Sequence, residues 1–191
     1  MKKKDFNIII AGVGGQGIIT LLKILSEAAL IDGYDIKGSE LHGLSQRGGS
    51  VLAHLRFGEK ISSPLVSLGK ADLIIALEMS EALRRICFSG DKTISLINSK
   101  FIHYFGGSSQ KQVLAEIKKI KNKTYLVEAS DICKQKIGKE VLAGVYLVCF
   151  AVLKGLIPLS QESILLAIEK TVRKKYLAIN KKTFKLALKN I

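Results

Sequence analysis

The chain has 191 residues, of which 48% are hydrophobic and 24% are charged, as in folded globular proteins rather than disordered ones. Its net charge of +14 suggests nucleic-acid binding, but lysine supplies 25 of the 30 cations. Arginine, which makes bidentate contacts with phosphates and bases, supplies only 5. The lysines are scattered and no nucleic-acid-binding motif is visible, so we expect no nucleic-acid partner. A solvated Lys-rich surface is the preferred interpretation, and an acidic protein partner is the next.

The apolar segments are short. The longest run, residues 141–153, ends at Lys154 and falls below the roughly 18 residues that a membrane span needs. The basic N-terminus leads into a brief apolar stretch and then a glycine-rich turn, without the apolar core and cleavage site of a signal peptide. We therefore expect a cytoplasmic protein that makes no membrane contact.

Strands and helices alternate from the N-terminus onward. The Ile-rich residues 6–12 predict a buried strand, and apolar residues at helical spacing predict a helix over residues 18–33, which Gly33 can end. A short strand is expected at residues 34–38, followed by a polar loop over residues 38–51. Residues 50–58 alternate, with His54 and Arg56 on the polar face, and predict a half-buried strand. The remaining predicted elements are strands at 71–77, 92–99 and 123–130, a short helix at 80–88 and a Lys-rich helix around 111–121.

Beyond residue 130 the pattern is helical only. Asp131 is expected to cap a helix that reaches about Lys154, and Ser160 to cap a helix through residues 162–176. The basic, amphipathic residues 179–191 are expected to form a final turn or helix. Together the elements predict one domain over residues 1–191, a three-layer Rossmann-like α/β fold with a helical C-terminal part. The sheet should be mostly parallel, and it becomes mixed if the segment before Ser50 pairs antiparallel with the strand after it.

The sequence "GVGGQG" places Gly12, Gly14 and Gly17 in the G-x-G-x-x-G pattern between a strand and a helix. Glycines let backbone N–H groups approach a ligand, and the following helix N-terminus attracts an anion. Glu40 lies about where a ribose-binding acid would be in a dinucleotide-binding protein. The alternative is a tight turn whose glycines only permit close packing of the helix on the sheet. Gly15 and Gln16 make this turn more polar than that fold usually shows.

The segment "GSELHGLSQRGGSV", residues 38–51, is unusually rich in glycine and polar side chains. His42 is the one histidine inside it, and its neighbours Ser39 and Ser45 do not by themselves make a catalytic triad. Arg47 could clamp a carboxylate or phosphate, or form a salt bridge that fixes the loop. His54 is interpreted as structural, and the histidines lack the spacing of metal ligands. No catalytic residue is assigned.

Cys87, Cys133 and Cys149 lie far apart in the sequence. Their odd number and wide spacing argue against a disulfide framework and against an iron–sulfur cluster held by this chain alone. We expect buried, reduced and inert thiols.

Two segments together identify a resemblance to a known family. The patterns G-x-G-G-Q-G and S-E-x-H-G-x-S-Q-R-G-G, with the later "SSPLVSLGKADLIIALEMSEALR", resemble the small subunit of indolepyruvate:ferredoxin oxidoreductase. The wider group is the gamma-type subunits of the 2-oxoacid:ferredoxin oxidoreductases. The resemblance is close over residues 7–86 and looser beyond. It implies one subunit of an enzyme that decarboxylates a 2-oxoacid, transfers the acyl group to coenzyme A and reduces ferredoxin.

The resemblance also implies where the cofactors lie. Thiamine diphosphate and the iron–sulfur clusters would be held by a large partner subunit, with no cofactor on this chain alone. An arylpyruvate such as indolepyruvate would be the substrate, although pyruvate-type members carry similar domains. A free-standing NAD- or FAD-binding protein is the alternative hypothesis, and a homodimer in a crystal stays open.

The two glycine-containing loops should share a face. Because they follow the first and second predicted strands, both should open at the same edge of the sheet. We expect this face to contact the partner subunit, with a ligand at the boundary. Its predicted residues are Gly12, Gly14, Gly15, Gln16, Gly17, Glu40, His42, Ser45, Gln46, Arg47 and Gly48.

Overall fold

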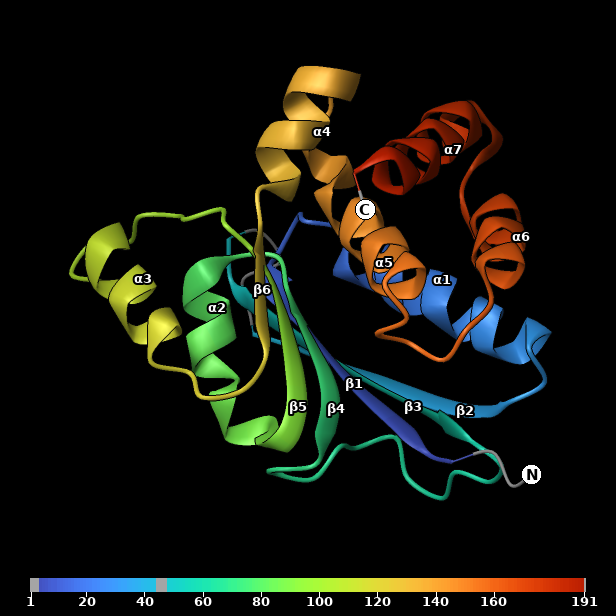
Figure 1. Cartoon of the computed structure of the whole chain (residues 1–191), viewed down its shortest axis with the longest axis horizontal. Helices are drawn as coiled ribbons and strands as arrows, with labels where there is room; N and C mark the ends of the chain where they lie inside the picture. Colours follow the sequence, from blue (N-terminus) through green and yellow to red (C-terminus); the bar gives the residue numbers. More distant parts are fainter. Residues whose placement is uncertain (1–3, 44–47, 191) are drawn as a thin grey trace.

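A computed structural model describes residues 4–43 and 48–190. Its centre is a six-stranded sheet in the order β2-β3-β1-β4-β5-β6 (Figure 1). β3 runs antiparallel to both of its neighbours, and the pairs β1–β4, β4–β5 and β5–β6 are parallel. The predicted mixed, mostly parallel sheet is therefore confirmed. The strands are β1 (Phe6–Val13), β2 (Asp35–His42), β3 (Ser50–Gly58), β4 (Ala71–Ala76), β5 (Ser89–Asn98) and β6 (Thr124–Val127).

The prediction of a loop over residues 38–51 was too long. Residues 38–42 belong to β2, which pairs in register with β3 from Asp35↔Gly58 to His42↔Val51. β2 is an edge strand, and five of the six residues that follow Ile36 in it are polar or glycine. Its polar composition therefore resembled a loop, because an edge strand exposes side chains that a central strand would bury.

β3 was expected to bury one face only, and that expectation was wrong. Leu52 and His54, on the face opposite Ala53 and Leu55, are also buried. The connection between β3 and β4 covers them, and Val66 in that connection packs in the same apolar cluster as Leu52. The polar side chain at this strand position was expected to face solvent, but an irregular segment crosses that face of the strand and buries it.

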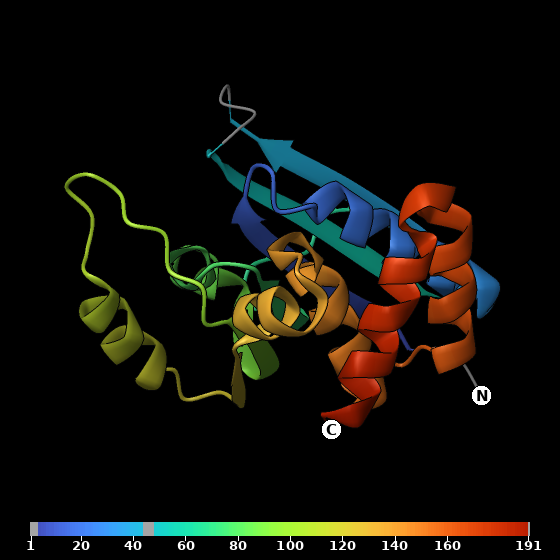
Figure 2. The ribbon, with the colours of Figure 1, turned by 90° about the horizontal axis from the view of Figure 1, so that it is seen from above.

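Helices cover both faces of the sheet, as the three-layer prediction required (Figures 1 and 2). On one face, α1 (Ile18–Ile31) and α5 (Ala143–Leu153) share the largest apolar cluster with Ile8, Ile10 and Leu55. On the other face, α2 (Met79–Arg84) and α3 (Gln110–Lys118) pack through Met79, Val113 and neighbours against Ala76 and Ile97. The 3-10 turn η1 (Ile86–Phe88) continues α2, within the predicted short helix.

The long helix predicted over residues 131–154 is divided. α4 (Ala129–Ile137) ends at Gly138, whose φ of 80° is left-handed, and the 3-10 turn η2 (Glu140–Leu142) leads into α5. Glycine at this position permits the left-handed cap at which a helix stops. Asp131 lies in the first turn of α4 and is not its N-cap. α5 is then buried almost throughout its length, which accounts for its continuous apolar sequence.

The C-terminal helices confirm two predictions and shorten a third. The Ser160 hydroxyl caps α6 (Gln161–Thr171) by accepting a hydrogen bond from Ser163 N–H, as predicted. α6 stops at Thr171 rather than at residue 176, and the basic tail forms α7 (Lys174–Lys189). Ser160 N–H also donates to the Asp32 carboxylate over 2.7 Å, so the start of α6 is fixed to the end of α1. Within the described residues, no helix has the length and apolar character to cross a membrane.

Candidate functional site

The glycine turn joins β1 to α1, and its glycines serve different purposes. Gly15 and Gly17 have φ values of 101° and 83°, a left-handed conformation that strains other residues. Gly12 is buried, and a β-carbon on it would lie 2.6 Å from the Gln16 side-chain oxygen and 3.0 Å from the β-carbon of Leu77. The pattern therefore combines backbone freedom at two positions with close packing at a third.

Gln16 is engaged within the chain. Its side-chain oxygen accepts a hydrogen bond from Val13 N–H over 2.7 Å, and its amide donates to the Leu77 carbonyl over 3.4 Å. These bonds join the end of β1 to the residue that follows β4. Gln16 therefore braces the turn, and the exposed part of the turn is Gly15.

The two predicted loops meet. Gly14 N–H donates to the Gly49 carbonyl over 2.8 Å, and Gly48 N–H donates to the Gly14 carbonyl over 3.3 Å. Gly48 has a left-handed φ of 74°. The expectation that both loops open at one edge of the sheet is confirmed for these residues. Ser45, Gln46 and Arg47 lie outside the described residues, so their predicted roles stay predictions.

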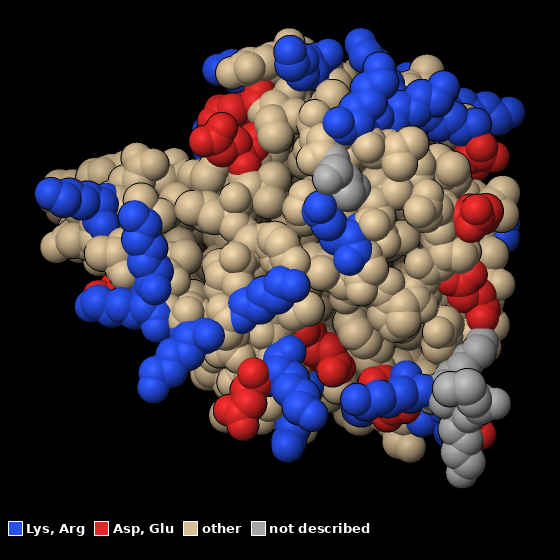
Figure 3. Space-filling model, in the orientation of Figure 1, with Lys and Arg blue, Asp and Glu red and all other residues tan. Residues whose placement is uncertain are grey.

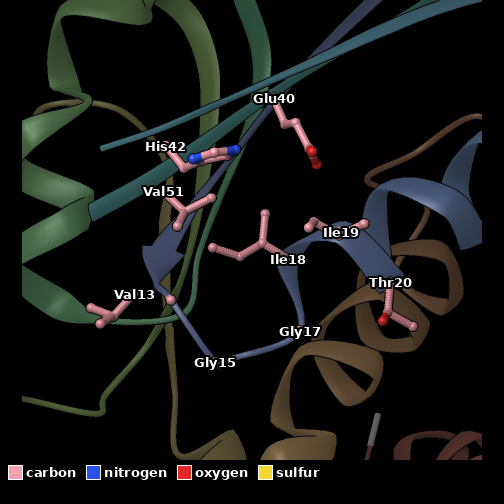
Figure 4. A pocket seen from close by; sticks show the side chains of 10 residues that line it. Val13, Gly15, Gly17, Ile18, Ile19, Thr20, Glu40, His42 and Val51 are labelled. Atoms are coloured by element: carbon pink, nitrogen blue, oxygen red, sulfur yellow. The ribbon is translucent and has the colours of Figure 1, made fainter. Parts of the chain in front are cut away.

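A pocket of about 510 Å³ lies where the glycine turn, the start of α1 and the end of β2 meet. Figure 4 shows Glu40 and His42 projecting from β2 over Ile18 and Ile19, with the Glu40 carboxylate directed toward the start of α1. α1 begins after Gly17 without a side-chain cap. The pocket thus presents an apolar floor, a carboxylate, an imidazole and a helix N-terminus with partial positive charge. This combination suits an amphipathic ligand or a protein surface.

The strand order removes Glu40 from the position that a dinucleotide-binding protein requires. In that fold the second strand lies directly beside the first. Here β3 lies between β1 and β2, so β2 is one further strand spacing, about 4.8 Å, from the glycine turn. Glu40 therefore has the sequence position of a ribose-binding acid, but it does not lie where such an acid lies in a dinucleotide-binding fold.

A buried polar network beneath the loop was missed by the sequence interpretation. The Ser50 hydroxyl donates to the Glu81 carboxylate over 2.5 Å, and the Arg85 guanidinium donates to Ser50 over 2.6 Å. Arg84 lies 3.3 Å from the same carboxylate, which is only 2% exposed. The network joins the first residue of β3 to α2 and fixes the end of the loop from the other face of the sheet.

Glu78 extends this internal bonding. Its carboxylate accepts hydrogen bonds from Glu81 N–H over 2.9 Å and from Ile102 N–H over 3.1 Å. Glu78 and Glu81 are spaced as an N-cap residue and its third successor, a pattern typical of a helix start. That spacing, directly after a predicted buried strand, is the signal that could have placed both acids at this edge.

A smaller hollow of about 270 Å³ lies on the far side of the glycine turn. Asn98 at its base donates to the Leu77 carbonyl over 3.0 Å and to the Ser130 hydroxyl over 2.9 Å. Lys100 and Glu140 form a 2.9 Å ion pair beside it, and the hydrogen bond from Lys100 lowers the pKa of Glu140. The polar side chains at its base hydrogen-bond to one another, so most of their hydrogen-bonding capacity is used within the chain.

The histidines and cysteines are not grouped as metal ligands within the described residues. His54 is buried, and its Nδ1 accepts a hydrogen bond from Val66 N–H over 3.1 Å, so the structural interpretation of His54 is supported. Burial, with the positive charge of Arg85, lowers the pKa of His54. Across residues 4–43 and 48–190, no group of three or more His, Cys, Asp or Glu side chains is arranged to hold a metal ion.

The predicted burial of the cysteines is confirmed for two thiols and wrong for the third. Cys133 and Cys149 are buried and Cys87 is exposed. Burial raises the pKa of Cys133 to about 11 and also raises that of Cys149. Iron–sulfur clusters are usually held by four closely grouped thiolates, and this chain has only three cysteines. These donors therefore do not fit an iron–sulfur cluster.

Comparison with known proteins agrees with the resemblance. The family model for pyruvate ferredoxin/flavodoxin oxidoreductase matches residues 7–190. The indolepyruvate oxidoreductase subunit IorB of Thermococcus kodakarensis is 36% identical over 97% of this chain and 96% of its own. The common gamma subunit of the pyruvate/ketoisovalerate oxidoreductases of Pyrococcus abyssi is 29% identical over 84% of this chain and 83% of its own.

The fold has solved counterparts. The crystal structure of the gamma subunit of a keto/oxoacid ferredoxin oxidoreductase from Geobacter sulfurreducens superposes with a TM-score of 0.71 at 21% identity, over 96% of each chain. The chain therefore belongs to the pyruvate ferredoxin/flavodoxin oxidoreductase family, as a subunit of a 2-oxoacid:ferredoxin oxidoreductase.

Proposed function

We propose that residues 1–191 form one gamma-type domain, the small subunit of an indolepyruvate-type oxidoreductase. The complex would oxidatively decarboxylate an arylpyruvate, release CO₂, transfer the acyl group to coenzyme A and pass two electrons to ferredoxin. The observation that carries this proposal is the 36% identity to an indolepyruvate oxidoreductase subunit along nearly the whole chain. The identity to the pyruvate/ketoisovalerate subunit is lower, at 29%.

The thiamine diphosphate and the iron–sulfur clusters are assigned to a large partner subunit. The donor set of this chain supports that division, because it has only three cysteines and, among the described residues, no three His, Cys, Asp or Glu side chains are grouped to hold a metal ion. Coenzyme A is a co-substrate of the complex. The chain itself would act in the cytoplasm, where ferredoxin is available to the complex.

The carboxyl edge of the sheet is the proposed contact face. Gly15 is exposed, and Glu40 and His42 line the 510 Å³ pocket beside it. These groups would meet the partner subunit, with a ligand at their boundary. Ser45, Gln46 and Arg47 are proposed to complete this face. Gly12, Gly14, Gln16, Gly17 and Gly48 shape it through the packing and hydrogen bonds described above.

Co-purification tests the proposal. The tagged chain, expressed together with a large indolepyruvate oxidoreductase subunit of the same organism, should carry that subunit through affinity and size-exclusion steps. The isolated complex should reduce a ferredoxin or a redox dye in the presence of indolepyruvate and coenzyme A. Failure of the large subunit to associate would contradict the proposal.

Substrate choice is tested on the same complex. Indolepyruvate and phenylpyruvate should support electron transfer with at least about tenfold higher kcat/KM than pyruvate, because an aromatic ring adds apolar surface that a matching pocket can bury. Equal or higher kcat/KM for pyruvate would overturn the arylpyruvate assignment and leave the family assignment in place.

Calorimetry addresses the dinucleotide alternative. The isolated chain should show no micromolar binding of NADH or FAD, because β3 separates Glu40 from the glycine turn. Binding with a Kd of about 1 μM, roughly −8 kcal/mol, would favour a free-standing dinucleotide-binding protein.

A further inference from the structure

A second depression, larger than the candidate pocket, lies among the helices. It has a volume of about 650 Å³ and is formed by the start of α1, the connection from η2 to α5 and the junction of α6 with α7. We refer to it as the helical groove and define it by Ile19, Lys23, Lys139, Val141, Arg173 and Tyr176. It also includes Gln16 and Gly17, so it adjoins the glycine turn.

Large apolar side chains stand exposed in this groove. Ile19, Val141 and Tyr176 are 47%, 58% and 50% exposed and come from three different elements. Single exposed apolar side chains are normal on a protein surface, whereas a cluster around one concavity is typical of an interaction site. Burial of these side chains against a partner would stabilise a complex.

The charged side chains of the groove are all cations. Among its described lining residues there is no Asp or Glu, and Lys23, Lys139 and Arg173 form no ion pair with a described carboxylate. Nearby lysines behave differently: Lys170 pairs with Glu27 at 2.8 Å, and Lys181 pairs with Glu169 at 2.5 Å. The cations of the groove therefore lack the internal partners that neighbouring cations have.

The positive charge elsewhere gives a contrast. Figure 3 shows Lys and Arg side chains gathered over α7 and again over α3. On α3, Lys111 and Lys118 are exposed, but no pocket described in the structure includes them. Cations over a convex helix are readily solvated. The groove combines cations, exposed apolar side chains and concave shape. A neighbouring hollow of about 400 Å³ shares Lys23 and includes the exposed Leu30, but it also contains the carboxylate of Glu27.

We infer that the helical groove is the docking site for a segment of the large partner subunit that carries apolar anchor side chains flanked by Asp or Glu. The inference rests on the proposed function. A second copy of this chain fits poorly, because each copy carries a net charge of +14 and the two would repel. A segment seated in the groove would touch Gln16 and Gly17, and so bring the partner to the edge of the candidate pocket.

Charge reversal tests the inference with a matched control. The groove variant is Lys139→Glu with Arg173→Glu, and the control is Lys111→Glu with Lys118→Glu on α3, which changes the net charge equally. α3 lies at the opposite end of the molecule from α7 (Figures 1 and 2). Biolayer interferometry with the purified large subunit would give the Kd. We expect the groove variant to bind at least about tenfold more weakly, and the control within about twofold of wild type.

The apolar part of the groove is tested separately. Val141→Asp should also weaken binding at least about tenfold, because it places an unpaired charge where an apolar anchor would be buried. Val141→Leu should bind like wild type. Circular dichroism and thermal unfolding would verify that each variant is folded, as expected for exposed positions.

The outcomes separate the docking site from the function. If wild type binds the large subunit and the groove variants bind equally well, the docking site is wrong and the proposed function stands. If the α3 control weakens binding as much as the groove variant, the attraction is a general effect of net charge, and the docking site is again wrong. If wild type does not bind the large subunit at all, the proposed function fails.

Discussion

The carboxyl edge of the sheet and the helical groove adjoin one another, yet the buried polar groups of the edge and the charged groups of the groove are paired differently. At the edge, the side chains of Gln16, Glu78, Glu81 and Asn98 are hydrogen-bonded within the chain. In the groove, Lys23, Lys139 and Arg173 have no described ion-pair partner, and three large apolar side chains stand exposed. Polar residues that look functional in the sequence can thus be structural, while residues that belong to no motif, from α1, η2 and the junction of α6 with α7, supply the open surface.

The contrast predicts two different effects of substitutions, one on folding and one on association. Buried, hydrogen-bonded groups stabilise the fold, so their loss should lower the free energy of unfolding. Exposed groups without internal partners contribute little to folding, so their loss should affect only association.

Glu81→Ala should produce the largest loss. The carboxylate is 2% exposed, and its removal leaves the Ser50 hydroxyl without its acceptor and the Arg85 guanidinium without the carboxylate 3.7 Å away. We expect the free energy of unfolding to fall by about 3 kcal/mol, as when one partner of a buried charge pair is removed. Urea denaturation of the isolated chain would measure it.

Glu116→Ala is the control for Glu81. Glu116 pairs with Lys119 on the exposed surface of α3, with 54% of its side chain accessible. An exposed pair contributes about 0–1 kcal/mol, so this variant should unfold close to wild type. Equal losses from the two substitutions would show that the network beneath the loop has no special structural importance.

Gln16→Ala should have an intermediate effect. It leaves Val13 N–H without the acceptor that lies 2.7 Å away, at the point where β1 enters the glycine turn. The expected loss is about 1–2 kcal/mol for an unsatisfied, partly buried donor. Hydrogen exchange should also rise at the amides of residues 13–17. Unchanged stability and exchange would mean that Gln16 does not brace the turn and is available to bind.

These roles show how far the sequence could lead. The strand at residues 6–12 and the cap at Ser160 were predictable because apolar periodicity and capping chemistry are local signals. The edge-strand position of residues 38–42 and the break at Gly138 were not, because they depend on which neighbours cover a segment. The sequence motifs placed Gln16 and Glu40 in one predicted site. In the structure Gln16 braces the turn through Leu77, whereas Glu40 is separated from β1 by β3 and lines the pocket.

Acidification tests the buried edge through His54, with a smaller effect. Burial lowers the pKa of His54 in the folded chain below its ordinary value of 6.5, so the unfolded chain binds the proton more readily. The contribution of neutral His54 to stability is therefore complete above about pH 6.5 and is lost as the pH falls below that value. Urea midpoints between pH 7 and pH 5 should decline less in His54→Gln than in wild type. Parallel declines would contradict this assignment.

Val141→Asp should have the smallest effect on folding. Val141 is 58% exposed, so the free energy of unfolding should change by no more than about 0.5 kcal/mol. The same variant is expected to lose affinity for the large subunit. A large loss of stability would show that Val141 contributes to folding, and would contradict the distinction between the edge and the groove.

The most direct test of the account is a titration of activity. A fixed amount of large subunit would be titrated with the chain, and indolepyruvate-dependent reduction of ferredoxin would be recorded. We predict no activity without the chain, saturation at equal amounts, and a shift to at least about tenfold higher concentration for Lys139→Glu with Arg173→Glu. Full activity of the large subunit by itself would contradict the assignment of this chain as a required subunit.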